Sequence, residues 1–322
     1  GRNVAIIGAG PAGLAVAEGL AVHGHHCVVY DAWPEPGGIL VYGIPTFKLS
    51  KQIVEEKIEF LSSLGVEFVQ NTRIGRDIPF ATLARDHDAI FIGIGAGLGG
   101  RLRIDGEDLR QVYEATDFLV RGNLAPSARP SEMQDPVRAG DRVVVIGGGD
   151  TSMDCVRTAR RLGASEVTCI YRRTESELRG REEERRHARE EGVHFQYLTT
   201  PLRFLADGDT LRALVCQRME LAEPDESGRR RPAPVSGSEF EIPCDAAVVA
   251  IGYSADPVLR EADLALELDR AGLILIDRES GRTNLPGVFA GGDDVNGADL
   301  VVTALADGRR AAEAMDAYLR GL

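Results

Sequence analysis

The sequence predicts an α/β fold of two three-layer domains, each built around a parallel sheet, with the second domain inserted into the first. Two long segments, residues 3–32 and 141–173, share one pattern: an apolar strand, a glycine-rich turn, a helix and a second strand. Two further runs, residues 88–97 and 245–253, place an aspartate before an apolar strand that leads to glycine. Alternating strands and helices are typical of parallel sheets, because parallel strands need a crossover connection.

The composition is that of a globular protein and disfavours several classes of function. Of 322 residues, 43% are hydrophobic and 27% are charged, and the formal net charge is −13. An acidic surface repels phosphates, which disfavours general binding to nucleic acid or to anionic membranes. No apolar run approaches the roughly 18–20 residues of a membrane span. No secretory leader precedes the first strand, so we expect a cytoplasmic protein.

The cysteines and histidines point to no metal site. The five cysteines are widely separated and show no C-x-x-C pair, zinc spacing or iron–sulfur spacing. The six histidines show no metal or catalytic-triad spacing. We therefore expect reduced cysteines in the core and no bound metal.

The first long segment carries a complete dinucleotide-binding pattern, typical of a Rossmann-like domain. A strand at 4–7, a helix at 14–22 and a second strand at 26–30 surround the run GAGPAG, and Asp31 ends the second strand. In such a run the first glycine makes the tight turn, the second lets pyrophosphate approach the backbone, and the third lets the helix pack closely. The helix N-terminus then offers unsatisfied N–H groups to the phosphates. The run consists of Gly8, Ala9, Gly10, Pro11, Ala12 and Gly13.

The second long segment repeats this pattern with one change in the glycines. Gly147 and Gly149 follow a strand at 143–146, and Ser152 stands where the third glycine would be. A small residue there still permits close packing of the helix. The helix is expected to run to about Leu162, and the next strand covers 166–171.

The two segments differ in charge where the second strand ends. Aligned on their glycines, with two extra residues in the helix–strand turn of the second segment, they bring Asp31 opposite Arg172. An acid accepts hydrogen bonds from a ribose hydroxyl, whereas arginine donates a planar fork to phosphate. The first segment therefore predicts FAD or NAD, and the second predicts NADP held by Arg172 or Arg173. The alternative is that both arginines are solvated charges beside the mixed-charge segment 174–192, where Arg179 and Arg181 could equally serve either purpose.

Four further stretches complete the expected organisation. Gly95 and Gly252 follow strands expected to be the last parallel strand of each unit, with glycine where the chain passes close to a nucleotide or crosses between domains. Residues 220–239 are a charged, proline-containing excursion from a hairpin or meander. Residues 50–65 predict an amphipathic helix. Its expected apolar side consists of Ile53, Val54, Ile58, Leu61 and Leu64.

The C-terminal stretch combines a short strand at 288–290, an acidic turn at Gly292 and Asp293, and a long helix from about Leu300. An acid on such a turn can bond a ribityl hydroxyl, or a flavin-linked phosphate through water. The helix N-terminus, formed by Leu300, Val301 and Thr303, could stabilise negative charge on a reduced flavin. The alternative is a polar loop before an ordinary terminal helix.

Five motifs together resemble a known family. They are GAGPAG at 8–13, PGGILVYGIPTFKL at 36–49, GGGDTSMDC at 147–155, YRR at 171–173 and AGGDDVNGADLVVTALADGR at 290–309. They are similar to motifs of the small (β) subunit of NADPH-dependent glutamate synthase and of related FAD/NAD(P) oxidoreductases, and the resemblance covers essentially the whole chain.

The resemblance implies a flavoprotein with FAD in a discontinuous domain, residues 1–118 and 254–322, and NADPH in an inserted domain, residues 119–253. By resemblance, the FAD contacts are Gly8, Gly10, Gly13, Asp31, Gly38 and Asp293. The NADPH contacts are Gly147, Gly149, Asp150, Thr151, Arg172 and Arg173.

The implied chemistry is hydride transfer from NADPH to FAD, with electrons passing on to an iron–sulfur protein, domain or large subunit of a hetero-oligomer. This chemistry belongs to the cofactors, so no catalytic acid, base or nucleophile is expected from the protein. Family members usually carry an N-terminal cysteine-rich iron–sulfur domain, which this sequence lacks. The alternatives are a stand-alone NAD(P)H:acceptor (ferredoxin-type) reductase and a flavin-binding subunit without turnover. Thioredoxin reductases need a C-x-x-C pair that is absent here.

Overall fold

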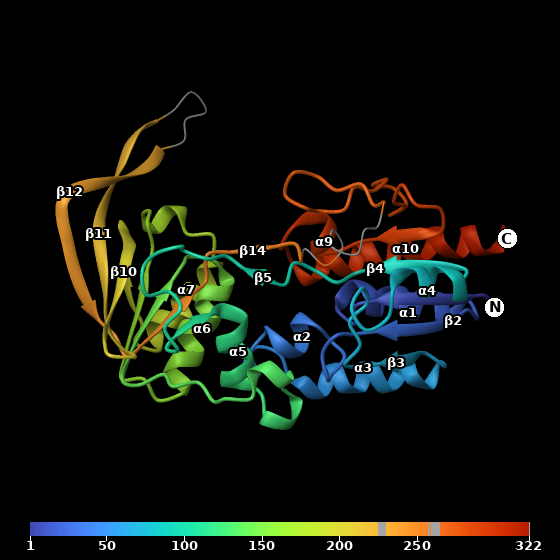
Figure 1. Ribbon diagram of the computed structural model, residues 1–322, viewed down its shortest axis with the longest axis horizontal. Coiled ribbons are helices and arrows are strands. Elements are labelled where there is room, and N and C mark those ends of the chain that lie inside the picture. The colour runs from blue at the N-terminus through green and yellow to red at the C-terminus, as the bar shows by residue number, and fades with distance from the viewer. Residues whose placement is uncertain (225–229, 257, 259–264, 322) are drawn as a thin grey trace. The chain divides into compact units, whose positions relative to one another are not determined.

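The computed structural model describes residues 1–224, 230–256, 258 and 265–321. The chain divides into two compact units (Figure 1). Unit 1 comprises Gly1–Leu98, Ser127–Pro130 and Tyr253–Leu322, and unit 2 comprises Gly99–Pro126 and Ser131–Gly252. Two short strands, β5 (Leu98–Gly99) and β14 (Tyr253–Ser254), pair where the chain passes from one unit to the other.

The first division of the chain lies earlier than the expected residue 119. The reason is β6 (Val112–Glu114), which pairs in parallel with β13 (Ala246–Val249) and so belongs to the sheet of unit 2. A three-residue strand gives too short an apolar pattern to be assigned to one sheet from sequence.

Unit 1 contains a five-stranded parallel sheet in the order β15-β4-β1-β2-β3. Its strands are β1 (Asn3–Ile7), β2 (His26–Tyr30), β3 (Glu67–Val69), β4 (Ala89–Ile92) and β15 (Val288–Ala290). Its helices are α1 (Pro11–Val22), α2 (Ile39–Tyr42), α3 (Lys51–Ser63), α4 (Phe80–Asp86), α9 (Asp293–Asn296) and α10 (Val301–Arg320).

Two apolar clusters cover the two faces of this sheet. One joins the sheet to α1, α3 and α10, and the other joins it to α4 and to residues such as Leu266 and Ile274. Helix α10 packs closely on α1, because a Cβ added to Gly308 would lie 2.3 Å from the carbonyl oxygen of Ala12. The C-terminal helix thereby holds the start of α1 from outside.

Helix α3 buries fewer of its apolar residues than its pattern predicts. Val54 and Leu61 are buried, but Ile53 is 59% exposed and Leu64 is 37% exposed. Adjacent residues on a helix point about 100° apart, so Ile53 turns to solvent when Val54 faces the sheet. The expectation for Ile53 and Leu64 was wrong.

Unit 2 contains a second five-stranded parallel sheet, in the order β6-β13-β7-β8-β9. The strands not yet given are β7 (Arg142–Ile146), β8 (Glu166–Ile170) and β9 (His194–Gln196). The helices are α5 (Ala115–Asn123), α6 (Asp150–Arg161) and α7 (Glu182–Glu190), with short 3₁₀ turns at Pro126–Ala128, Ser131–Met133 and Glu175–Glu177.

The other face of this sheet is covered by strands instead of helices. An antiparallel sheet of β10 (Thr199–Asp207), β11 (Thr210–Pro224) and β12 (Arg230–Pro243) lies on this face (Figure 1). Its residues Phe204, Leu214 and Ile242 belong to one apolar cluster with the parallel strands. The expected meander around 220–239 is confirmed for the described residues. Unit 2 therefore has three layers, with helices on one face of the parallel sheet and an antiparallel sheet on the other.

In chain order β13 is the last strand of its parallel sheet, as expected, but β4 is not the last strand of its own sheet, because β15 follows it. β15 lies beyond β4, and β6 lies beyond β13. Each outer strand comes from a segment distant in sequence from its glycine motif, so the local pattern did not reveal it. In the described part of the chain, no helix has the length and apolar character needed to cross a membrane.

Candidate dinucleotide-binding sites

The glycine-rich turn of unit 1 follows β1 and depends on close backbone packing. Gly8 has φ of +101°, and a Cβ there would lie 2.3 Å from the carbonyl oxygen of Gly93. A Cβ on Gly13 would lie 2.0 Å from the carbonyl oxygen of Gly8. Real Cβ atoms do not come so close to backbone, so these two positions require glycine for the fold itself.

Gly10 differs from both because its missing side chain leaves open space. It is the N-cap of α1 in an extended conformation, and a Cβ there would meet nothing within 4 Å. Among the described residues no side chain caps this helix, which begins with Pro11, Ala12 and Gly13. The backbone N–H groups of its first turn therefore face an open approach that suits a phosphate.

Asp31, directly after β2, is bonded to the glycine-rich turn. One carboxylate oxygen accepts from the N–H of Ala9 at 2.7 Å, and the other accepts from the N–H of Trp33 at 2.9 Å. Burial raises the pKa of Asp31, while these hydrogen bonds and the charge of Arg73 oppose the rise. Each oxygen has further lone pairs, so the carboxylate can both hold the turn and accept from a ribose hydroxyl.

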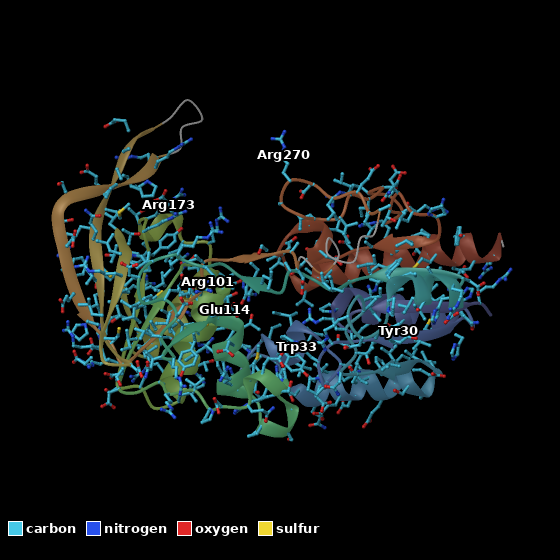
Figure 2. All side chains as sticks on the ribbon, in the orientation of Figure 1. Tyr30, Trp33, Arg101, Glu114, Arg173 and Arg270 are labelled. Carbon is cyan, nitrogen blue, oxygen red and sulfur yellow. The ribbon has the colours of Figure 1, made fainter. Side chains whose placement is uncertain are left out.

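The segment that contains Gly38 lies on the same turn. Gly37 donates its N–H to the carbonyl of Ala9 at 2.9 Å. Gly38 has φ of +52°, and a Cβ there would lie 2.8 Å from the Cα of Gly10. The segment is braced by Trp33 (labelled in Figure 2), whose ring meets that of Tyr42 edge-on at 4.3 Å between centroids.

The acidic turn after β15 is also brought to the start of α1. A Cβ on Gly292, which has φ of +97°, would lie 3.1 Å from the Cβ of Ala12. Burial raises the pKa of Asp293 to about 6, and the nearby charges of Asp299 and Asp307 add to the rise. The structure thus gathers Gly8, Gly10, Gly13, Asp31, Gly38 and Gly292 around one turn.

The remaining predicted residues of unit 1 lie in two other places. Gly95 follows β4 with φ of +74°, and a Cβ there would meet nothing within 4 Å. Leu300 is the exposed N-cap of α10, with Val301 as its first residue and Thr303 in its first turn. No side chain of the described residues caps α10.

Two buried acids of unit 1 were missed by the sequence analysis. Asp307 accepts from the N–H of Gly292 at 3.1 Å and from the side-chain amide of Asn296 at 2.6 Å. Asp294 is 2% exposed and accepts from the N–H of Ile94 at 3.1 Å, and burial raises its pKa well above the usual range. Both contacts join segments distant in sequence or on different elements, so no local pattern signals them.

The glycine-rich turn of unit 2 repeats that of unit 1. A Cβ on Gly147 would lie 2.1 Å from the carbonyl oxygen of Ala250, whereas a Cβ on Gly149 would meet nothing within 4 Å. Gly149 is the N-cap of α6, and no side chain of the described residues caps the helix. Ser152 is fully buried and donates to the carbonyl of Ala250 at 3.3 Å, so it fastens the helix to β13 as well as being small.

Asp150 and Thr151 are the first two residues of α6. The carboxylate of Asp150 is bound by Arg181, which donates its backbone N–H at 2.8 Å and its side-chain Nε at 3.0 Å. Arg181 is 31 positions away in sequence, so this pair could not be read from a local pattern. Gly252, after β13, has φ of +111° and open space where a Cβ would be.

The alignment of Asp31 with Arg172 is wrong by one residue. Ile7 of β1 lies opposite Tyr30, and Ile146 of β7 lies opposite Ile170. The residue that corresponds to Asp31 is therefore Tyr171, and Arg172 follows it. Strand pairing, rather than the number of residues after the glycines, sets this correspondence.

The two arginines have different surroundings. Arg172 is exposed and has no hydrogen-bond or ion-pair partner in the described part of the chain. The side chain of Arg173 (labelled in Figure 2) is only 16% exposed, and it lies 3.8 Å from Glu177. Arg172 is thus free to bind an anion, while Arg173 is partly committed to the protein.

Both units therefore share the two features that suit a dinucleotide. Each has an uncapped helix N-terminus beside a glycine whose missing side chain leaves open space, at Gly10 and at Gly149. An acid lies at the edge of the first turn, and a free cation lies near the second. Within the described residues, no group of three or more acidic, cysteine or histidine side chains could hold a metal ion.

Comparisons with known proteins agree with this geometry. A family model for pyridine nucleotide-disulphide oxidoreductases matches residues 2–308. The small chain of NADPH glutamate synthase from Escherichia coli K12 is 43% identical over 325 residues, which cover 99% of this chain and 69% of that protein. The β subunit of NADP⁺-dependent formate dehydrogenase from Moorella thermoacetica is 44% identical over 322 residues, covering 99% of this chain and 44% of that subunit.

The solved structures show the same fold. FprA from Mycobacterium tuberculosis, solved in complex with NADPH, superposes with a TM-score of 0.83 at 20% identity, covering 99% of this chain and 85% of that one. Thioredoxin reductase from Lactococcus lactis gives a TM-score of 0.75 at 22% identity, with full coverage of both chains. Because the family model spans nearly the whole chain and the identity to the glutamate synthase small chain is 43%, this chain belongs to the pyridine nucleotide-disulphide oxidoreductase family and is glutamate synthase small chain-like.

Proposed function

We propose that this chain is an NADPH-oxidising flavoprotein module, with FAD in unit 1 and NADPH in unit 2, that passes electrons to an iron–sulfur partner. The observation that carries the proposal is the contrast between two matched turns. In unit 1 the strand end carries Asp31, which suits an unphosphorylated ribose. In unit 2 the matching residue is Tyr171, and Arg172 beside it is exposed and free, which suits a ribose 2′-phosphate.

The proposed contacts follow the sequence prediction with some changes of role. For FAD they are Gly8, Gly10, Pro11, Ala12, Gly13, Asp31, Gly38, Gly95, Gly292 and Asp293, with the start of α10 at Leu300, Val301 and Thr303. For NADPH they are Gly147, Gly149, Thr151, Arg172 and Gly252, with Arg173 and Asp150 supporting the site.

When bound, FAD and NADPH would supply the chemistry, a hydride transfer from nicotinamide to flavin followed by release of electrons. The protein positions the cofactors and supplies charge. Two open helix N-termini face the phosphates, and side chains distinguish the unphosphorylated ribose of FAD from the 2′-phosphorylated ribose of NADPH. Two relatives whose names include NADPH or NADP⁺ are named as parts of larger enzymes: a glutamate synthase small chain and a formate dehydrogenase β subunit. This supports a role within a larger complex, and the final acceptor is set by the partner.

A cytoplasmic location is part of the proposal. All five cysteines are buried and free, and burial raises the pKa of Cys27, Cys169, Cys216 and Cys244 to about 12. Thiols in this state are inert core residues, as in proteins of a reducing compartment.

The test is to purify the chain, record its visible spectrum and titrate it with NADPH without oxygen. We expect the spectrum to show flavin absorption. NADPH should bleach this absorption at a lower concentration than NADH requires. Absence of flavin, or a bound flavin that NADPH never bleaches, would contradict the proposal and favour a structural subunit. Rapid reduction of ferredoxin by the isolated chain would favour a stand-alone reductase, and iron and sulfide analysis of the natural complex would reveal a cluster-bearing partner.

A further inference from the structure

The segment after β8 folds back over the glycine-rich turn of unit 2. Arg179 and Gly180 both donate their N–H groups to the carbonyl of Gly148, at 3.0 and 2.9 Å. A Cβ on Gly180 would lie 3.3 Å from the carbonyl carbon of Gly149, so the two backbones pack directly against each other. We call residues 174–181 the strap. It lies against the turn at which the nucleotide phosphates are proposed to bind.

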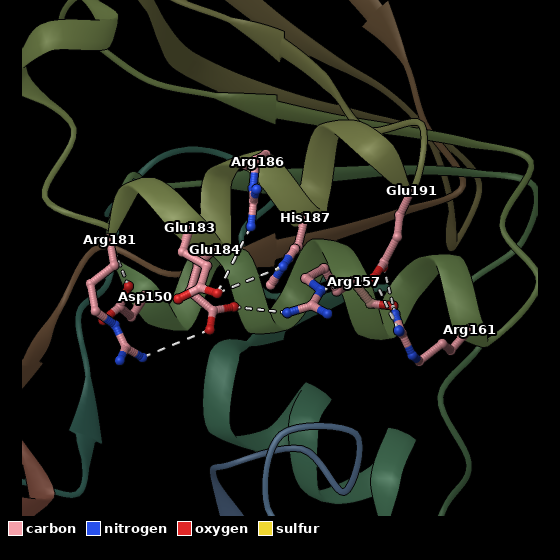
Figure 3. Close-up of polar contacts among 9 residues, drawn as sticks. All are labelled: Asp150, Arg157, Arg161, Arg181, Glu183, Glu184, Arg186, His187 and Glu191. Carbon is pink, nitrogen blue, oxygen red and sulfur yellow. Dashed lines mark hydrogen bonds and ion pairs between the residues drawn. The ribbon is translucent and has the colours of Figure 1, made fainter.

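The strap is fastened to α6 by the pair of Asp150 and Arg181. Arg181 donates twice to the Asp150 carboxylate, at 2.8 and 3.0 Å, and its Nη2 lies 3.8 Å from Glu184 (Figure 3). Glu184 in turn accepts from Arg157 at 2.8 Å. The Arg181 side chain is 62% exposed but is held from both sides.

Asp150 puts a negative charge in an unusual place for such a site. Asp150 is the first residue of α6, and its negative charge there stabilises the helix by its interaction with the macrodipole. The same N-terminus is proposed to receive a pyrophosphate, which carries negative charge of its own. In unit 1 the corresponding first residue is the uncharged Pro11. One of the two matched helices therefore carries an acid where an anion should bind.

We propose that Arg181 masks the charge of Asp150, so that the N-terminus of α6 can accept the nucleotide pyrophosphate. Arg181 is a positioning residue in this role, because it acts on the ligand through Asp150. The inference rests on the proposed function, since it takes a dinucleotide to bind at this turn. It also explains why Asp150, expected to hold NADPH, has its carboxylate engaged by the protein.

The effect of losing Arg181 differs from that of losing Arg172. An unmasked carboxylate repels the pyrophosphate, which NADP⁺ and NAD⁺ share, so both should bind more weakly by the same factor. We expect the repulsion to weaken binding about tenfold, which corresponds to about 1.4 kcal/mol. The 2′-phosphate is not involved, so 2′-AMP, which has no pyrophosphate, should bind as before.

The experiment measures dissociation constants of NADP⁺, NAD⁺ and 2′-AMP by calorimetry for Arg181→Ala, Asp150→Asn and the double variant. Arg186→Ala is the matched control. Arg186 lies on α7, is also 62% exposed, and contacts Glu183 instead of Asp150 (Figure 3). It also contacts Glu190. We expect Arg181→Ala to weaken both dinucleotides about tenfold at low salt, with the loss shrinking at high salt. The double variant should recover most of that affinity, and the control should not change it.

The double variant separates charge masking from simple fastening of the strap. If fastening were the whole role, the double variant would bind as weakly as Arg181→Ala, and 2′-AMP would be weakened too; either result overturns the inference. If the parent binds NADP⁺ but Arg181→Ala and Arg186→Ala bind the dinucleotides with equal affinity, the inference is also overturned. A parent chain that binds neither dinucleotide would overturn the proposed function together with this inference.

Discussion

The Asp31 carboxylate accepts a hydrogen bond from the backbone N–H of Ala9 at 2.7 Å, which ties the end of β2 to the glycine-rich turn of unit 1. In unit 2 the matching residue is Tyr171, whose hydroxyl donates to the carbonyl of Glu177 at 3.0 Å. The position that an acid holds in the first turn is therefore held by a tyrosine in the second. The two halves of the chain share a scaffold and differ in the one side chain that would repel a 2′-phosphate.

Arg172 and Arg173 should behave differently when replaced. We expect Arg172→Ala to weaken NADP⁺ binding by about 1.5–3 kcal/mol, the value of a hydrogen bond to a charged group, and to leave NAD⁺ binding unchanged. Arg173→Ala should lower thermal stability more and change the NADP⁺ to NAD⁺ ratio less, because its side chain packs beside Glu177. Calorimetric titration and thermal unfolding of both variants check this. A larger selectivity change in Arg173→Ala would contradict the assignment.

The glycines of the two turns should separate into folding and binding positions. Gly10 and Gly149 both have extended backbones and open space at Cβ, so alanine fits there without strain. The added methyl group would occupy the proposed path of the pyrophosphate. We expect Gly149→Ala to fold normally, to keep its flavin and to bind NADP⁺ at least about tenfold more weakly, a cost of about 1.4 kcal/mol. Gly10→Ala should instead lose flavin.

The control for this pair is Gly13→Ala. Its Cβ would lie 2.0 Å from the carbonyl oxygen of Gly8, so this variant should lose stability and soluble yield as well as flavin. Flavin content, circular dichroism and NADP⁺ affinity distinguish the three variants. Normal NADP⁺ affinity in a well-folded Gly149→Ala protein would show that the pyrophosphate does not approach this glycine.

Arg157 should be a main support of the α6–α7 contact. It is 8% exposed, and it donates to Glu184 at 2.8 Å and to Glu191 at 3.0 Å (Figure 3). Removing one partner of a buried ion pair leaves uncompensated charge, so Arg157→Ala should lower the free energy of unfolding by about 3 kcal/mol. Urea denaturation measures this. The exposed Arg186→Ala should change it by less than about 0.5 kcal/mol, and equal stability of the two variants would contradict the prediction.

Asp293 should make the nucleotide-free protein less stable as pH rises. Its pKa is raised by burial from 3.8 to about 6, so the folded state binds this proton more tightly than the unfolded state. Its stabilising contribution is therefore complete below the unfolded pKa and is lost as pH rises through about 6. The free energy of unfolding of Asp293→Asn should equal that of the parent near pH 3.8. Above about pH 6 it should exceed that of the parent by at least about 1 kcal/mol.

The measurement is urea denaturation at several pH values with bound nucleotide removed. Asp277 is a control of opposite sign, because its hydrogen bonds with Ser280 lower its pKa. Asp277→Asn should be less stable than the parent only at pH values above the ordinary pKa of an aspartate. A pH-independent gain in Asp293→Asn would contradict a titration effect.

The two glycine-rich turns, the paired units around them and the family could all be predicted from the sequence. These features are local: a tight turn, a close helix contact or an open phosphate path requires glycine within a few residues of a strand. Features that depend on contacts between distant segments could be seen only in the tertiary structure. Strand pairing showed that Tyr171, not Arg172, matches Asp31.

Chain folding also decided the partners of the charged residues. Asp150 meets Arg181 across 31 positions, β6 joins the second sheet, and Arg173 turns toward Glu177 while Arg172 stays free. A side chain's charge can be read from the sequence, but whether that charge is already neutralised depends on which segments the fold brings together. That distinction separates the arginine proposed to bind the ligand from those that prepare its site.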